Sequence, residues 1–262
     1  MDNFDEVILC TIPRTGSTLI YRILRYIFKD KNIKKSHSFE KYFDHKGPFV
    51  MTYRDPIDIL CSFWRIDAKQ GKWENNEISD LEAVRLCARV LFEYSRFNDF
   101  VLKQIVLDDN SRNLLFLRYE DFWDNYDIIY DKLSSFFDIE ISSDKRKELT
   151  DKCSMKSVLE IQKKYKDFSE VDKETAIHGD HIGLAKPYKW WDENKDKISP
   201  SAVNYVIYKL NYLRFIYNYR VISPDDYVQV LFRREATERM NIVKSGRFIY
   251  VDDRLEEGDE KS

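Results

Sequence analysis

Residues 7–19 read VILCTIPRTGSTL, and this stretch decides which fold the sequence predicts. Its apolar, β-branched start predicts a buried strand over residues 7–12, and helical periodicity follows over residues 17–29. Gly16 lies in the turn between them. A strand, a tight turn and a helix start favour a bound anion, because backbone N–H groups and the helix dipole are positive there. Arg14 adds a full positive charge to this turn.

The turn differs from the phosphate loop of nucleotide triphosphatases. That motif is G-x-x-x-x-G-K-[ST], in which the lysine contacts the phosphates and the hydroxyl binds Mg²⁺. Here Gly16 is the single glycine and no lysine precedes Ser17. A P-loop kinase or another nucleotide-binding protein that uses ATP and Mg²⁺ is therefore kept as the alternative interpretation.

A second strand-to-helix junction carries another pattern that favours anion binding. Residues 49–53 predict a short strand that ends before Arg54. Asp55 is the expected N-cap of a helix over residues 56–68. Ser62 lies two helical turns after this cap, so its hydroxyl returns to the face on which the helix starts. An arginine and a hydroxyl placed in this way can hold one phosphate group together.

These segments, in this order, resemble the sulfotransferase family, whose strand–loop–helix binds the sulfate donor PAPS (3′-phosphoadenosine 5′-phosphosulfate). The turn at residues 13–19 is similar to the Pro-Arg-Ser-Gly-Thr-Thr-Leu form of its tyrosylprotein branch. Arg54 and Ser62 match a family arginine and serine, and Asp58 matches a family aspartate. The resemblance implies that Arg54 and Ser62 bind the 3′-phosphate of the donor. It also implies that the phosphosulfate is held by the loop residues Arg14, Thr15, Gly16, Ser17, Thr18 and Leu19.

The resemblance also selects a candidate base. In the cytosolic sulfotransferases a Lys-Thr-His tripeptide precedes the arginine strand, and Lys35-Ser36-His37 occupies the similar position here. By resemblance His37 is the general base, a role that suits its near-neutral pKa. Lys35 and Arg14 are then expected to stabilise the departing phosphate oxygen. His45 lies in an expected loop, and we rank it behind His37.

Two later segments carry further expected donor contacts. Residues 114–118 predict a buried strand, and by resemblance Tyr119 contacts the adenine. Glu120 and Asp121 suit the start of a helix that continues over residues 122–137. The family's Arg-Lys-Gly loop is missing near residue 180, where His181, Lys186 and Lys189 are the cations that can replace it. Leu19 stands where many relatives have a tryptophan stacked on the adenine, so the stacking surface must come from elsewhere.

Composition sets limits on the class of protein. The chain has 262 residues, a net charge of −3 and a pI of about 5.9, so we expect no nucleic-acid partner. Its four cysteines are scattered without the spacing of metal ligands, which suits a reducing compartment. We expect no metal requirement, because cations and N–H groups would hold the leaving nucleotide. No apolar run has the length of a membrane span, and the first residues do not resemble a signal peptide. A cytoplasmic location is the resulting expectation.

The order of the expected elements defines the fold class. Strands alternate with helices, including a long helix over residues 79–107, and this predicts an α/β fold. We expect a three-layer, P-loop-type parallel sheet with helices on both faces and a helix-rich C-terminal half that includes a helix over residues 200–217. Residues 1–220 form the expected sulfotransferase-like domain. Residues 221–262 form an extension of unassigned role, of which residues 256–262 are expected to be disordered.

The predicted reaction is transfer of a sulfuryl group from PAPS to a hydroxyl or amine, leaving 3′-phosphoadenosine 5′-phosphate (PAP). The acceptor is a small molecule, a carbohydrate or a lipid. We expect the segment 65–80 and the aromatic residues Phe39, Tyr42 and Phe43 to border its pocket. A catalytically silent homologue that only binds PAPS is a further alternative. The sequence does not indicate an oligomeric state.

Overall fold

Four parallel strands form one sheet, in the order β2-β1-β3-β4. The computed structural model describes residues 4–70, 78–107, 113–167, 169–172, 175–179, 186–189, 191 and 198–219. Within these, the central strands β1 and β3 pair through Ile8 with Phe49 and Leu9 with Val50. Apolar side chains fill both strands, as a parallel sheet that is buried on both faces requires. The strands are β1 (Glu6–Cys10), β2 (Asn32–Ser36), β3 (Phe49–Tyr53) and β4 (Leu114–Arg118).

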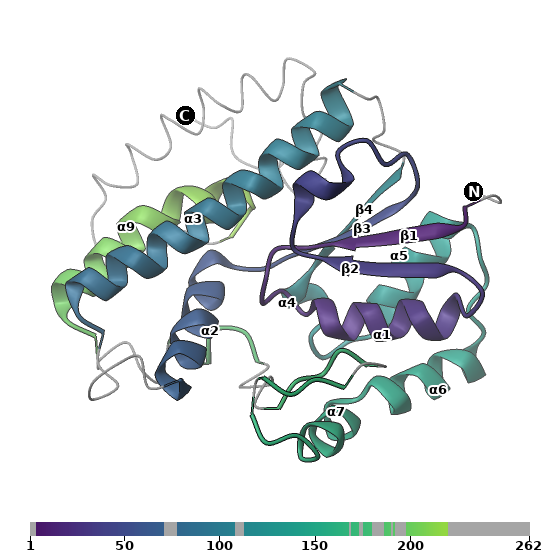
Figure 1. Cartoon of the computed structure of the whole chain (residues 1–262). Coiled ribbons are helices and arrows are strands. Elements are labelled where there is room, and N and C mark those ends of the chain that lie inside the picture. Colours follow the sequence, from purple (N-terminus) through teal and green to yellow (C-terminus); the bar gives the residue numbers. More distant parts are fainter. Residues whose placement is uncertain are drawn as a thin grey trace, which may run out of the picture. The chain divides into compact units, whose positions relative to one another are not determined.

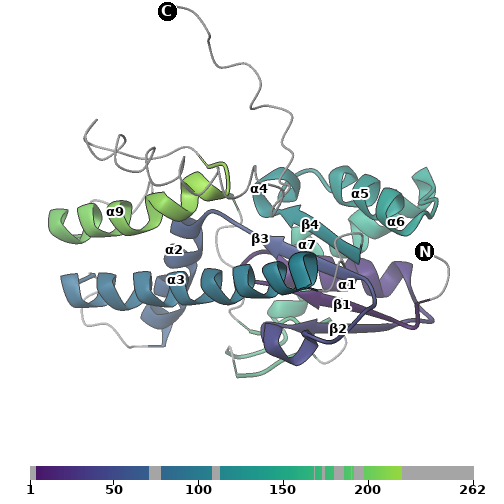
Figure 2. The ribbon, with the colours of Figure 1, turned by 90° about the horizontal axis from the view of Figure 1, so that it is seen from above.

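Helices connect the strands and cover both faces of the sheet (Figures 1 and 2). A short 3-10 turn, η1 (Phe39–Tyr42), follows β2, and a π-helical turn, η2 (Lys103–Leu107), continues the long helix α3. The helices are α1 (Ser17–Ile27), α2 (Pro56–Lys69), α3 (Asp80–Leu102), α4 (Tyr119–Phe122), α5 (Asp127–Phe137), α6 (Ser143–Cys153), α7 (Met155–Gln162) and α9 (Pro200–Ile216).

Each face of the sheet has its own apolar layer. On one face Val7, Leu9 and Val50 belong to a buried cluster that also takes in side chains of α1, α4, α5 and α6. On the other face Phe49 packs against Phe100 of α3, with ring centroids 5.0 Å apart. Helices therefore enclose a parallel sheet in three layers, and the predicted α/β fold class is confirmed.

The element boundaries differ from the prediction at three places. Strand β2 was not predicted, because Ile33 is the only apolar residue among its five and the strand lies at an edge of the described sheet. The helix predicted over residues 122–137 is wrong, since α4 and α5 are separated by a break at residues 123–126. The helix predicted over residues 79–107 ends as an α-helix at Leu102 and continues as the π-helical turn.

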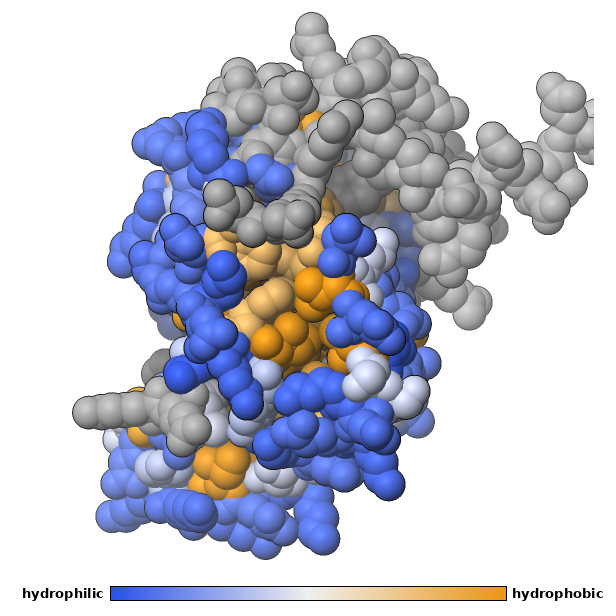
Figure 3. All heavy atoms as spheres, turned by 90° about the vertical axis from the view of Figure 1, so that its right-hand side faces the viewer, coloured by the Kyte–Doolittle hydropathy of each residue, from blue (hydrophilic) through white to orange (hydrophobic). Residues whose placement is uncertain are grey.

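An aromatic cluster lies at the amino end of β1. Phe4, which precedes β1, packs against Phe28 and Phe137 with ring centroids 5.6 Å and 5.2 Å away. Figure 3 shows the face on this side, where apolar residues gather at the centre and hydrophilic residues surround them. The polar groups that follow the strands lie at the opposite, carboxyl ends.

The chain divides into two compact units, Met1–Leu210 and Asn211–Ser262. All strands and helices α1 to α7 belong to the first unit. Of the second unit, the described residues form the last turns of α9, which close with a hydrogen bond of 2.7 Å from the Tyr219 N–H to the Arg214 carbonyl. The extension predicted over residues 221–262 lies outside the described residues. None of the helices in the described ranges combines the length and the apolar character that crossing a bilayer requires.

Candidate functional site

A cavity of about 570 Å³ lies where the parallel strands end. His37 directly follows β2 and Arg54 directly follows β3, and both line the cavity together with Arg14 from the turn after β1. Carboxyl ends of parallel strands meet at one edge of a sheet, which is where ligands bind in open α/β folds. Three segments that are distant in the sequence therefore contribute to one site.

The turn after β1 has an unusual backbone. Gly16 caps α1 with φ at +79°, and Arg14 has φ at +72°, so two residues of the turn adopt the left-handed conformation. A Cβ atom on Gly16 would lie 2.8 Å from the ring of Tyr119. Glycine is required here both by the backbone angle and by the aromatic ring beside it. Gly16, Ser17, Thr18 and Leu19 all line the cavity.

Thr15 differs from the other residues of this turn. Its hydroxyl donates to the Ile12 carbonyl at 2.7 Å and also contacts the hydroxyl of Thr52 in β3. The side chain is fully buried and does not line the cavity. Thr15 was predicted to hold the donor, but its contacts stabilise the turn on the side away from the cavity.

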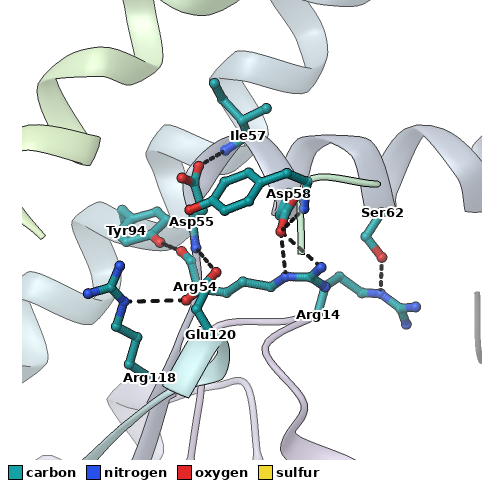
Figure 4. Close-up of polar contacts among 10 residues, drawn as sticks. Arg14, Arg54, Asp55, Ile57, Asp58, Ser62, Tyr94, Arg118 and Glu120 are labelled. Atoms are coloured by element: carbon teal, nitrogen blue, oxygen red, sulfur yellow. Dashed lines mark hydrogen bonds and ion pairs between the residues drawn. The ribbon is translucent and has the colours of Figure 1, made fainter. Parts of the chain in front are cut away.

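Arg14 reaches across the cavity to α2. Its Nε donates to the Ser62 hydroxyl at 2.9 Å, which joins the first junction to the second (Figure 4). Burial lowers the pKa of Arg14, and the charges of Arg65, Arg54 and Arg89 lower it further. Repulsion between these cations and the buried Arg14 guanidinium is unfavourable, and a bound anion would relieve it.

Lys35 lies on the same side of the cavity as the start of α1. Its Nζ donates to the Thr18 hydroxyl at 2.8 Å. Burial, with the charge of Arg14 as a second cause, lowers its pKa to about 8. Lys35 is therefore mostly protonated at neutral pH and gives the cavity a second buried positive charge.

His37 has a fixed orientation. Its Nδ1 lies 2.9 Å from the Thr11 carbonyl and 3.1 Å from the Thr11 hydroxyl, and a hydrogen bond to the carbonyl, which only accepts, requires the tautomer with the proton on Nδ1. Burial lowers the pKa of His37 to about 4, and the nearby charges of Lys35 and Arg14 act in the same direction. The ring is neutral at pH 7, and Nε2 keeps the lone pair that a general base needs.

Arg54 is fixed on several sides (Figure 4). Its Nη2 and Nε lie 3.0 Å and 3.2 Å from an Asp58 carboxylate oxygen, and its guanidinium lies over the ring of Tyr119 at 4.1 Å from the centroid. Asp58 also accepts hydrogen bonds of 3.0 Å and 3.1 Å from the Tyr188 N–H. This contact brings the short segment that carries Lys186 to the cavity, and Lys186 is one of the lining residues.

The acidic residues at the two junctions support the backbone. Asp55 caps α2 by accepting from the Ile57 N–H at 2.9 Å, as predicted. Glu120 accepts from the Asp55 N–H at 2.9 Å, and Arg118 lies 3.5 Å from Glu120. Glu120 is therefore a structural residue that ties the β4 junction to the β3 junction.

One wall of the cavity was missed by the sequence prediction. It is formed by the corner between α6 and α7, where Ser154 ends one helix and caps the next by accepting from the Ser157 N–H at 3.2 Å. The residues of this wall are Trp123, Tyr126, Cys153, Met155 and Val158. A serine between two short helical patterns was the available signal. Leu19 also lines the cavity.

The opposite wall is formed by the end of α2. Arg65, Ile66, Asp67 and Gln70 line it, which agrees with the expectation for the segment 65–80, although residues 71–77 lie outside the described ranges. Arg89 of α3 completes this wall and lies 3.8 Å from Asp67.

The aromatic residues predicted beside this pocket lie elsewhere. Phe39 is fully buried in the layer between η1 and α3, where it packs on Phe97 and Phe100. Neither Tyr42 nor Phe43 lines the cavity, so this part of the prediction is wrong. His45, ranked behind His37, packs on Phe49 outside the cavity. His181 lies outside the described residues.

The cavity is strongly cationic. Among the described residues that line it, six are lysine or arginine and two are acidic. The cations are Arg14, Lys35, Arg54, Arg65, Arg89 and Lys186, and the acids are Asp58 and Asp67. Within the described part of the chain, no group of three or more His, Cys, Asp or Glu side chains is arranged to hold a metal ion.

Comparison with known proteins identifies the family of the chain. The model of the sulfotransferase domain family matches residues 37–178, more than half of the chain. The chain belongs to the sulfotransferase family. Transfer of a sulfuryl group is therefore the general reaction to which the site relates. The matched region starts at His37 and includes both Arg54 and Tyr119.

A solved structure shares the fold. The crystal structure of mouse sulfotransferase SULT7A1 complexed with PAP superimposes with a TM-score of 0.51, covering 87% of this chain and 88% of that chain. The two sequences are 12% identical, so this likeness concerns the fold. No curated protein sequence matches the chain.

Proposed function

We propose that this sulfotransferase transfers the sulfuryl group of PAPS to a hydroxyl or amine, with His37 as general base. The observation that carries the proposal is the position of four groups around one cavity. Arg14, Lys35 and Arg54 supply positive charge there, and His37 presents a neutral ring whose Nδ1 is occupied by Thr11. The three cations can bind an anionic donor, and His37 can accept a proton from the sulfuryl acceptor.

Charge supports PAPS as the donor. The described lining residues have an excess of about four positive charges with His37 neutral. PAPS carries about four negative charges at neutral pH, given a phosphate second pKa near 6. The turn of residues 14–19 would hold the phosphosulfate, because the first N–H groups of a helix lack intrahelical acceptors. Arg54 and Ser62 would hold the 3′-phosphate through charge-assisted hydrogen bonds.

The wall of Trp123, Tyr126, Met155 and Val158 suits the adenine. These side chains line the cavity and present apolar surface, which a purine ring prefers. Tyr119 lies between Arg54 and Gly16, so its ring supports the phosphate contacts from beneath. Lys186 and His178 line the same cavity and add polar groups near its rim. His181 is retained as a proposed donor contact.

The proposed reaction is an in-line displacement. The acceptor oxygen forms a bond to sulfur while His37 Nε2 takes its proton. The bond between sulfur and the 5′-phosphate oxygen breaks, and the electron pair stays on that oxygen of PAP. Lys35 and Arg14 stabilise the new charge on this leaving group. Donor binding neutralises the same two cations, which raises the pKa of His37 from its low value in the free protein and strengthens it as a base.

The acceptor is proposed to bind against the α2 wall. That wall combines Ile66 with the polar groups of Gln70 and Asp67, which suits a small molecule or glycan that carries hydroxyl groups. The described segments contain no group of three or more side chains that could hold a metal ion. The proposed transfer uses only protein cations and N–H groups.

The test is a transfer assay with radiolabelled PAPS over a panel of phenols, sugars, lipids and amines. Transfer of label to at least one acceptor is the expected result. A thermal-shift comparison of PAP with ATP–Mg²⁺ accompanies it, and PAP should stabilise the protein more. A larger shift with ATP–Mg²⁺ would instead favour the kinase alternative. A shift with PAP but no transfer to any acceptor would favour the silent homologue.

A further inference from the structure

A second cavity lies along the second half of α1. The donor cavity receives the first residues of this helix, whereas the second cavity is lined by its last turns, the following loop and the start of β2. Its volume is about 530 Å³, and it shares no lining residue with the donor cavity. Arg22, the central residue of α1, lies four residues after Thr18, so the linings of the two cavities are about one helical turn apart along this helix.

The second cavity is cationic. Arg22, Arg25, Lys29 and Lys31 line it, and no aspartate or glutamate is found among the described residues that line it. The protein as a whole has a net charge of −3, so this local excess is not a general property of its surface. Anions are the ligands that such a cavity attracts.

Two lining side chains hold buried polar atoms without partners. Arg22 is 3% exposed, and its Nη2 donates to the Lys152 carbonyl at 2.5 Å, but its Nε and Nη1 have no partner. Thr175 is 8% exposed, and its hydroxyl also has no partner. Buried donors are almost always satisfied in folded proteins, because an unmade hydrogen bond is costly. Two unsatisfied groups that line the same cavity indicate that a ligand completes it.

We propose that this cavity binds a phosphate or sulfate group. Arg22 would donate from Nε and Nη1 and Thr175 from its hydroxyl, which are the donors that tetrahedral oxyanions accept best. Arg25, Lys29 and Lys31 add charge around the opening. The cavity is larger than one oxyanion, and Tyr21 and Tyr26 add aromatic surface to its lining. A monoester of a carbohydrate therefore fits better than the free ion.

The site is tested first by soaking crystals of the full chain with selenate, which is isosteric with sulfate and visible by anomalous scattering. The expected result is one anomalous peak beside Arg22 and Thr175 and another in the donor cavity. In crystals of Arg22→Gln the first peak should disappear while the donor-cavity peak remains. A wild-type protein with no peak in the second cavity would overturn the proposal, whatever the donor cavity shows.

Affinity is measured by calorimetric titration with inorganic phosphate, inorganic sulfate and glucose 6-sulfate. If glucose 6-sulfate binds more tightly than either inorganic ion, the ligand of the cavity is a monoester. If all three bind equally, the ligand is the free ion. Arg22→Gln removes the charged hydrogen bonds and should weaken the binding of these anions at least about tenfold.

A second variant keeps the test independent of any folding defect in Arg22→Gln. Lys29→Gln combined with Lys31→Gln changes partly or fully solvent-accessible side chains and should also weaken binding several-fold. The matched control is Lys156→Gln, which removes an exposed positive charge on α7 that lines neither cavity and should change nothing. Equal affinities in the double variant and the control would contradict the proposal.

Discussion

Arg14 Nε donates to the Ser62 hydroxyl at 2.9 Å, although 48 residues separate the two in sequence. Arg14 belongs to the turn after β1, and Ser62 lies in the second turn of α2 after β3. The contact and the shared lining show that the two junctions face one cavity, which the sequence could only suggest. Every prediction about the donor depends on this convergence.

Replacement of His37 should separate chemistry from donor binding. We expect His37→Ala to lower kcat about a thousandfold, the range in which a lost general base falls. PAP affinity should change less than about threefold, because Nε2 takes a proton and holds no phosphate. Single-turnover transfer and calorimetric titration with PAP measure the two quantities. His45→Gln is the matched control, since His45 packs on Phe49 outside the cavity. A variant that kept most of its turnover would show that another group is the base.

Replacement of Arg54 should discriminate between two nucleotides. Arg54→Ala is expected to weaken PAP binding by about tenfold to a hundredfold, the loss typical of hydrogen bonds to charged groups. AMP lacks the 3′-phosphate, so its affinity should fall much less. Ser62→Ala should give the same pattern with a smaller loss, and it leaves the Arg54–Asp58 pair intact. Equal losses for PAP and AMP in both variants would reject the assignment of the 3′-phosphate.

The pH dependence of kcat/KM should reflect two groups of the free enzyme. His37 has a pKa lowered to about 4 and acts in its neutral form, so activity is retained as pH rises above that value. Lys35 has a pKa lowered to about 8 and acts in its charged form, so activity falls as pH rises through that value. We therefore expect a plateau between about pH 5 and pH 7 and a decline above about pH 8.

A variant of Lys35 tests the upper limb of this profile. Lys35→Arg should move the decline to higher pH, because arginine stays protonated throughout this range. Lys34→Arg changes the neighbouring, exposed residue, whose partner is Glu6, and should leave the profile unchanged. A decline that stayed near pH 8 in Lys35→Arg would assign the limb to a different group.

Gly16 should be intolerant of any side chain. Gly16→Ala places a Cβ atom 2.8 Å from the Tyr119 ring and forces a left-handed backbone on alanine. Together these effects should reduce the free energy of unfolding by about 2 kcal/mol or more. Urea denaturation measures the change, and PAP titration should show weaker binding of the donor.

A second glycine provides the comparison. Gly47→Ala also meets a close neighbour, but that neighbour is the side chain of His45, which can move. Its loss of unfolding free energy should be the smaller of the two. If both variants lost equal stability, the left-handed angle and the Tyr119 contact would not explain why glycine is needed at position 16.

The positions of strands with apolar runs could be predicted from the sequence. β3 and β4 lie where their apolar runs indicated, and Asp55 caps α2 as its position before Pro56 suggested. β2 was missed because its pairing with β1, from Glu6 with Asn32 to Cys10 with Ser36, is a long-range contact that its polar composition does not encode. Such a strand is defined by its neighbour rather than by its own pattern.

The residues of the candidate site that belong to short sequence motifs could be predicted. Arg14, Lys35, His37 and Arg54 were named from spacing and resemblance, and all four line one cavity. The wall of Met155 and Val158 was missed, because apolar residues at a helix corner carry no chemical motif. Phe39 was misplaced for a related reason: an aromatic residue beside a candidate base can pack into the core as readily as into a pocket.

Strand β2 also bears on how the protein behaves at high concentration. It is an outer strand of the described sheet, and such strands offer unpaired backbone groups that can recruit another molecule. Here Lys34, with its side chain 47% exposed, projects from the middle of the strand that delivers Lys35 to the donor cavity. A lysine at this position discourages strand addition, so one short polar segment both protects an edge of the sheet and lines the cavity.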